Sequence, residues 1–148
     1  MSVNEFAELG GRVLVIFDGY CGLCNRSVRW FLKRDRLDRM RFVASESPLV
    51  AGLLVRRGVD VTETGPSSIV VVRDAGGPEE RVLVRSEAVV ALLGELPRPW
   101  PGVGRVLRWI PQVVRDVGYR VIARWRYRIW GRLASCTLPT VEERGRFL

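Results

Sequence analysis

Two cysteines separated by two residues stand between an apolar segment and a helical segment. Cys21 and Cys24 follow the apolar run 13–17 and a turn that begins at Asp18, and they precede a stretch whose apolar residues recur at helical spacing. A CxxC pair on a turn between a buried strand and a helix is the arrangement used for thiol–disulfide exchange. The spacing therefore predicts redox chemistry.

The order of the two cysteines predicts different roles for them. A helix start presents free N–H groups and the positive end of the helix dipole, and both stabilise an anion. We therefore expect Cys21 to form a thiolate readily and to attack the disulfide of a protein or a small molecule. Cys24, one turn further and more buried, is expected to resolve the mixed disulfide. The pair itself is the redox group, so no separate cofactor is expected.

Zinc binding and inert packing are the alternatives for the pair. A structural zinc site needs four ligands. The chain has no histidine and one further cysteine, Cys136, so a zinc ion would require carboxylates or a second chain. We therefore expect no metal site. Two interpretations remain open for Cys136, a third redox thiol that pairs with the first two or a small buried apolar residue.

The hydrophobic pattern predicts a thioredoxin-like three-layer α/β fold. Its elements should follow the order β-α-β-α-β-β-α, with the cysteines at the start of the first helix and a hairpin near the end. We expect this domain to span residues 1–96, with a C-terminal helical extension over 97–148. The expected strands are 12–17, 40–44, 69–72 and 82–84, and the helices begin near Cys24, at Ser47-Pro48 and at an N-cap formed by Ser86.

Three residues near the pair are further candidates for the site. Asp18 can take the proton of Cys24 as a general base, or it can simply form the turn. Tyr20 either lines a substrate surface or covers the first strand. Pro66 precedes the third strand, where thioredoxin folds carry a cis-proline that faces the CxxC and receives the substrate backbone; the alternative is an ordinary loop proline.

Length and composition set the wider limits. The 148 residues fit one domain, and no run approaches the roughly 18 apolar residues of a membrane span. The first residues do not resemble a signal peptide, so the expected location is the cytoplasm, where three cysteines are not expected to be structural bridges.

The extension carries the net charge of +8. Nine arginines stand against one acid, Asp116, between residues 98 and 132. After a linker at 97–102, apolar residues recur at helical steps, with interruptions expected near Pro111 and Gly118.

Three interpretations fit this basic, tryptophan-rich segment. Its apolar stripe can pack on the domain with the arginines in solvent, or residues 98–132 can bind an anionic membrane surface or an acidic partner. No nucleic-acid-binding motif accompanies the charge, so nucleic acid is not expected. The alternative to an enzyme is therefore a peripheral membrane or partner-binding module on a thioredoxin-like shell, and the cytoplasmic location would then include membrane association.

The segment 17–25 resembles the DCC family of thiol–disulfide oxidoreductases, which is named for an Asp-Cys-Cys signature. The similarity extends over roughly residues 12 to 148, through 67–72, 84–89 and the C-terminal pattern that includes Tyr119, Arg128 and Cys136. It implies a thioredoxin-like fold and disulfide reductase chemistry carried by Asp18, Cys21 and Cys24. It supplies no substrate.

Overall fold

The computed structural model describes residues 12–19, 21–45, 50, 69–74, 78–131 and 144–147. Its sheet has four strands in the order β2-β1-β3-β4. β1 pairs parallel with β2, and β3 runs antiparallel to both β1 and β4. The strands are β1 (Val13–Phe17), β2 (Met40–Ala44), β3 (Val70–Arg73) and β4 (Arg81–Val84). The helices are α2 (Gly22–Arg34), α5 (Arg85–Gly94), α6 (Trp100–Arg108), α7 (Gln112–Trp130) and the 3-10 turn η1 (Arg144–Arg146).

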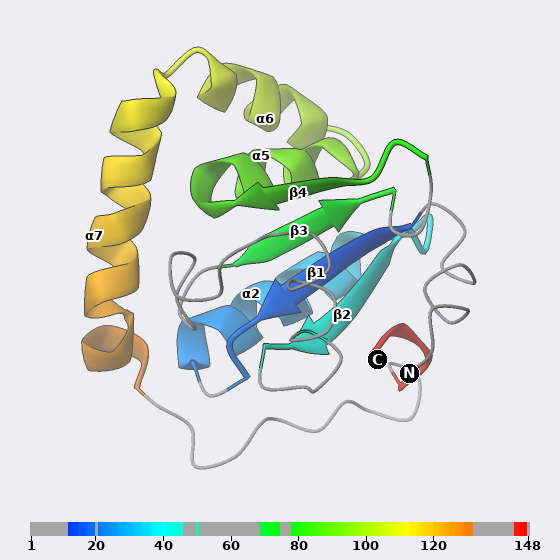
Figure 1. Ribbon diagram of the computed structural model, residues 1–148, viewed down its shortest axis with the longest axis horizontal. Coiled ribbons are helices and arrows are strands. Elements are labelled where there is room, and N and C mark those ends of the chain that lie inside the picture. Colours follow the sequence, from blue (N-terminus) through cyan, green and yellow to red (C-terminus); the bar gives the residue numbers. More distant parts are fainter. Residues whose placement is uncertain are drawn as a thin grey trace.

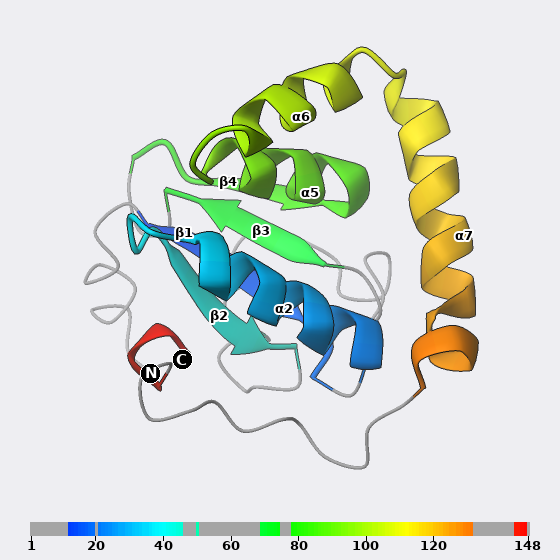
Figure 2. The same cartoon turned by 180° about the vertical axis from the view of Figure 1, so that it is seen from behind.

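This arrangement confirms the thioredoxin-like fold. A parallel β1-α2-β2 unit is followed by the β3–β4 hairpin and α5, as predicted, and all four predicted strands lie within a residue or two of their expected positions. Figures 1 and 2 show α2 and α5 on the same face of the sheet. The predicted helix after Ser47-Pro48 lies outside the described residues, apart from Val50, which packs on the opposite face with Leu14 and Ile16.

Burial of β1 on both faces explains its uninterrupted apolar sequence. Val13, Val15 and Phe17 face the core formed with α2 and α5, whereas Leu14 and Ile16 belong to the core on the other face. A strand that is covered on both sides gains from apolar residues at every position, so no alternation is visible in the sequence. This rigid central strand ends directly before the turn that leads to the cysteines.

Two boundary predictions near α5 and α6 are wrong. Ser86 is not the N-cap of α5: Val84 holds that position, and the Ser86 hydroxyl hydrogen-bonds the Asp116 carboxylate of α7 instead. A hydrogen bond to a charged carboxylate is stronger than one to a backbone amide. Capping rules consider only neighbouring residues, so they could not predict a partner on another helix. The expected linker 97–102 is helical from Trp100 onward, because a proline at 101 is tolerated in the first turn of a helix.

The extension is interrupted at one of the two expected places. α6 ends at Arg108 and α7 begins at Gln112, so the break at Pro111 is confirmed. α7 continues through Gly118, where the predicted interruption is wrong. A single helical glycine costs only about 1 kcal/mol relative to alanine, and the contacts of α7 with the domain outweigh that cost.

α7 packs on the domain through its polar side. Arg115 contacts the Glu87 carboxylate of α5 at 2.7 Å, and the Tyr119 hydroxyl accepts a hydrogen bond from the Ile69 amide at 2.9 Å. The expectation that the apolar stripe would pack on the domain is wrong for this helix, since its valines and isoleucines are exposed. Because Arg115 binds Glu87 of α5 and Tyr119 binds the Ile69 amide just before β3, the polar face of α7 turns toward the domain and the apolar face turns outward.

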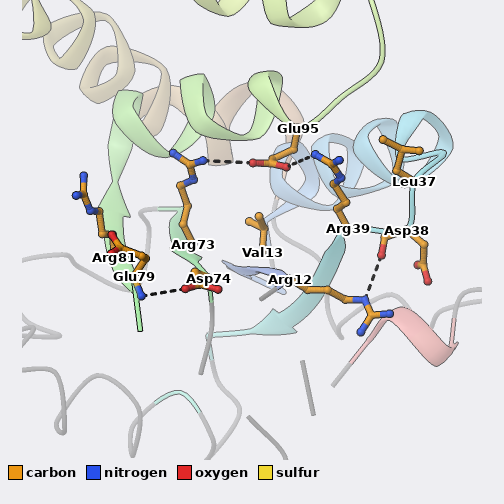
Figure 3. A pocket seen from close by; sticks show the side chains of 10 residues that line it. All are labelled: Arg12, Val13, Leu37, Asp38, Arg39, Arg73, Asp74, Glu79, Arg81 and Glu95. Carbon is orange, nitrogen blue, oxygen red and sulfur yellow. Dashed lines mark hydrogen bonds and ion pairs between the residues drawn. The ribbon is translucent and has the colours of Figure 1, made fainter. Parts of the chain in front are cut away.

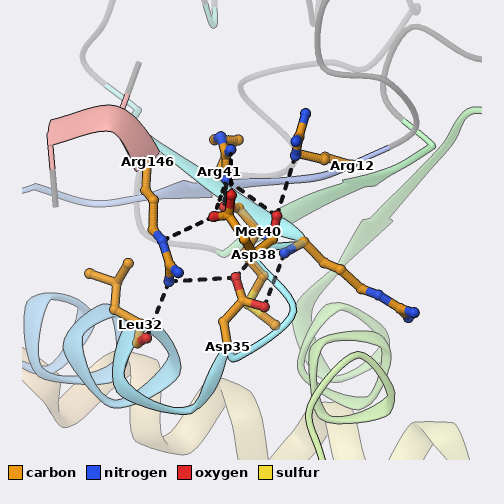
Figure 4. Close-up of polar contacts among 8 residues, drawn as sticks. Arg12, Leu32, Asp35, Asp38, Met40, Arg41 and Arg146 are labelled. Carbon is orange, nitrogen blue, oxygen red and sulfur yellow. Dashed lines mark hydrogen bonds and ion pairs between the residues drawn. The ribbon is translucent and has the colours of Figure 1, made fainter. Parts of the chain in front are cut away.

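The end of the chain is anchored beside β2 (Figure 4). Arg146 contacts Asp38 at 3.0 Å and Asp35 at 3.7 Å. Phe147 forms a parallel bridge with Phe42, and their ring centroids lie 5.7 Å apart. The 3-10 turn η1 lies directly before this bridge.

Candidate active site

The two cysteines lie at the start of α2, where the sequence placed them. Cys21 is the N-cap residue, with extended backbone angles, and its sulfur accepts a hydrogen bond from the Cys24 amide at 3.4 Å. This is the position in which serine or aspartate normally caps a helix. The sulfur of Cys21 therefore receives a backbone N–H and lies at the positive end of the helix dipole.

The burial of the two thiols is the reverse of the prediction. Cys21 has no exposed surface, whereas Cys24 is only partly buried against the main core. The first turn of α2 lies against the end of α7, because the Gly22 amide donates a hydrogen bond to the Gly131 carbonyl at 3.3 Å. Position along the helix therefore does not by itself predict which of the two thiols is more exposed.

Asn25 fixes the turn that carries Cys21. Its side-chain amide donates to the Gly19 carbonyl and to the Cys21 carbonyl, both at 2.9 Å. Sequence reasoning missed this role. Asparagine side chains often hydrogen-bond the neighbouring backbone, so an asparagine in the first turn of this helix could have indicated the role. Asn25 therefore holds together the two ends of the segment that connects β1 to α2.

Asp18 lies at the beginning of that segment. Its side chain is almost fully buried, and its backbone carbonyl accepts a hydrogen bond from the Cys21 amide at 3.3 Å. Asp18 and Cys21 thus share one backbone turn, and Cys24 follows in the first turn of α2. Tyr20, Pro66 and Cys136 lie outside the described residues.

The described residues hold a second polar feature far from the cysteines. A cavity of about 550 Å³ lies where β1 begins, at the opposite end of the strand from the CxxC turn (Figure 3). Arg39 and Arg73 both contact Glu95 there, at 3.2 and 3.5 Å. Glu95 thus pairs with two of the arginines that line the cavity. Among the residues that the structure describes, no three cysteine, aspartate or glutamate side chains gather as metal ligands would.

A thioredoxin-like fold with a CxxC pair at the N-terminus of its first helix defines a thiol–disulfide oxidoreductase class of protein. Comparison with known families agrees, since residues 15–132 match the family described as DCC1-like thiol-disulfide oxidoreductase. The chain belongs to this family, and the resemblance seen in the sequence is confirmed. A general thiol–disulfide oxidoreductase role follows from the membership.

Two relatives extend the similarity along nearly the whole chain. A chloroplastic DCC family protein of Arabidopsis thaliana is 34% identical over 135 residues, which cover 91% of this chain and 74% of the relative. An uncharacterized Bacillus subtilis protein, YuxK, is 31% identical over 141 residues, which cover 95% of this chain and 96% of that protein. No solved structure matches the chain.

Proposed function

We propose that the protein is a disulfide reductase that exchanges a Cys21–Cys24 dithiol with the disulfide of a protein or a small molecule. The observation that carries the proposal is the position of the Cys21 sulfur as the N-cap of α2, where it accepts the Cys24 amide hydrogen bond. A thiolate is the attacking form of cysteine, and the N-cap position places this sulfur next to a backbone donor and the positive end of the helix dipole before any substrate arrives. The pair serves as the redox group without another cofactor.

The proposed reaction proceeds in two exchanges and requires the buried Cys21 sulfur to become accessible to the substrate first. The Cys21 thiolate attacks one sulfur of the substrate disulfide, that S–S bond breaks, and the leaving sulfur takes a proton. Cys24 then loses its proton and attacks the Cys21 sulfur of the mixed disulfide, and the second substrate sulfur leaves. Two electrons pass to the substrate, and the Cys21–Cys24 disulfide remains. An external dithiol returns the pair to its reduced form.

Asp18 is the proposed base for the second exchange. The residue is nearly buried and begins the turn that leads to the pair, which supports a role as an acceptor of the Cys24 proton. Tyr20 and Pro66 are proposed to contact the substrate, and Cys136 is proposed as a third thiol that exchanges with the pair. The membrane alternative concerns a different surface and does not compete for these residues.

Single-cysteine variants test the division of roles. With dithiothreitol as the electron donor, we expect wild-type protein to reduce insulin disulfides and Cys21→Ser to be inactive. Cys24→Ser should accumulate a mixed disulfide through Cys21, which mass spectrometry of the unreduced peptide identifies. Asp18→Asn should form the mixed disulfide at the wild-type rate and resolve it more slowly. Full activity in Cys21→Ser, or a mixed disulfide carried by Cys24, would contradict the mechanism.

The reduction potential of the pair tests the direction of electron flow. A reductase requires a potential low enough for its dithiol to give electrons to the substrate, in the range near −270 mV of thioredoxin rather than about −120 mV of a strong oxidant. Equilibration with defined ratios of reduced and oxidised dithiothreitol, followed by alkylation and mass measurement, gives this value. A potential at the oxidising end of the range would exclude the reductase assignment and leave the exchange chemistry intact.

A further inference from the structure

One face of α7 exposes a continuous row of apolar side chains. Val113, Val117, Val121, Trp125 and Ile129 follow one another at four-residue steps, which place them along one side of a helix. Each is between 44% and 75% exposed, and Trp109, just before the helix, is 89% exposed. Figures 1 and 2 both show α7 at the side of the molecule, apart from the sheet. Exposed apolar surface of this extent marks a site of interaction.

A row of arginines runs beside the apolar row. Arg120, Arg124 and Arg128 are exposed and repeat at the same four-residue step. The Arg128 guanidinium lies 5.2 Å from the Trp125 ring centre, so the two rows touch. The sole acid between residues 98 and 131 is Asp116, which bonds Ser86 on the domain side. The outward charge of α7 is therefore entirely positive.

We propose that this face of α7 docks on an anionic lipid bilayer, with the helix lying in the plane of the surface. Valine, isoleucine and tryptophan side chains would enter the boundary between headgroups and acyl chains, and the arginines would contact lipid phosphates. No described helix is both long enough and apolar enough to cross a membrane, so the proposed contact is peripheral.

The charge pattern favours lipid over the other occupants. A second copy of this chain would bring an identical arginine row against the first, and like charges repel. An acidic protein would pair with the arginines but would also need an apolar strip of its own that matches the five-residue row along the length of α7. An anionic bilayer offers negatively charged phosphates to the arginine row and, just below them, acyl chains to the apolar row.

Docking would also place the cysteine pair near the lipid. α7 ends beside the first turn of α2, where the Gly131 carbonyl accepts the Gly22 hydrogen bond at 3.3 Å. The proposal does not depend on which cysteine attacks or on the direction of electron flow, because none of the docking residues belongs to the redox site. Loss of thiol activity would therefore leave lipid binding unchanged.

Vesicle binding by the full chain tests the proposal. We expect sedimentation with phosphatidylcholine vesicles that contain phosphatidylglycerol, a blue shift of tryptophan fluorescence, and little binding to phosphatidylcholine alone. Arg120→Glu/Arg124→Glu should weaken binding about tenfold or more. The double variant Lys33→Glu/Arg36→Glu makes the same change of net charge at exposed positions in and beyond the last turn of α2, and it should bind as wild type does.

A second pair of variants separates apolar contact from charge. Val117→Gln/Val121→Gln keeps the net charge and should also weaken binding, with circular dichroism and insulin reduction confirming that the fold is retained. Absence of vesicle binding, equal binding to neutral vesicles, or equal weakening by the Lys33/Arg36 control would overturn the proposal. Binding to polyglutamate without binding to vesicles would identify an acidic partner instead, and concentration-dependent dimers without vesicle binding would identify a second copy.

Discussion

The Gly22 amide donates a hydrogen bond to the Gly131 carbonyl at 3.3 Å, so the residue that follows α7 contacts the first residue of the helix that carries the cysteines. Gly22 is the first helical residue after Cys21, and its N–H is one of the donors that a helix start leaves unpaired. Gly131 adopts φ +77°, a left-handed conformation that favours glycine and commonly ends a helix. The end of α7 thus lies directly beside the candidate active site.

Gly131→Ala should open this contact. A side chain at a left-handed position costs about 1–2 kcal/mol even though a Cβ there meets no atom within 4 Å. We expect the buried Cys21 to react about tenfold faster with iodoacetamide, measured by mass spectrometry of the quenched protein. Gly118→Ala is the matched control, because its Cβ also meets nothing and its backbone is helical. Equal alkylation rates in wild type and both variants would show that Gly131 does not gate the thiol.

Asn25→Asp should slow the attack by Cys21. The substitution replaces a donor by a carboxylate oxygen that faces the Gly19 and Cys21 carbonyls at about the present 2.9 Å, so a hydrogen-bonded clamp becomes a repulsive contact. We expect insulin reduction to fall about tenfold. Arg26→Gln changes the net charge by the same amount at the adjacent, exposed position and should retain activity within a factor of about two. Comparable losses in the two variants would indicate a general charge effect.

Asp35→Asn should destabilise the fold without touching the cysteines. The Asp35 side chain is fully buried and accepts the backbone amides of Arg39 at 3.1 Å and Met40 at 3.0 Å through its two oxygens. An amide replaces one acceptor by a donor, which leaves a buried N–H without its partner at a cost of about 1–3 kcal/mol.

Urea unfolding of Asp35→Asn and Asp74→Asn measures this difference. Asp74 is the control because one of its oxygens accepts the Glu79 amide at 3.0 Å in an exposed turn, and asparagine can present its remaining oxygen there. We expect a change within about 0.5 kcal/mol for Asp74→Asn. Equal midpoints for the two variants would contradict the assigned role of Asp35.

Asp38 should make stability depend on pH in the acidic range. The hydrogen bonds from Arg41, at 2.8 and 3.1 Å, lower the pKa of the Asp38 carboxyl below its ordinary value of 3.8, and the charges of Arg41, Arg146 and Arg12 act in the same direction. A lowered folded-state pKa stabilises the fold above the unfolded-state value and loses this effect as the pH falls through the folded-state value. Asp38→Asn should therefore be less stable than wild type at neutral pH.

The difference between wild type and Asp38→Asn should shrink as the pH falls below about 3.8. Thermal unfolding of both proteins from neutral pH into this acidic range measures it. A difference that stays constant across the range would mean that the Asp38 charge does not contribute.

Local sequence signals predicted the framework of the site. The apolar run of β1, the turn after it and the helical periodicity after Cys24 placed the pair at a helix N-terminus, because each signal depends on neighbours within one or two turns of the chain. The β3–β4 hairpin was predictable for the same reason. The Ser86 cap failed because its partner, Asp116, lies 30 residues away on another helix.

The sequence by itself determined the fold class, the chemistry of the cysteine pair and the concentration of positive charge in the extension, since these follow from residue types and short periodicities. Only the tertiary structure decided which sulfur is covered, which carbonyl closes the start of α2 and which face of α7 turns outward. Those outcomes depend on contacts such as Gly22 with Gly131 and Tyr119 with Ile69, which join residues 50 or more positions apart. Amphipathic spacing shows that a helix has two faces, but the partners that the folded domain offers determine which of them is buried.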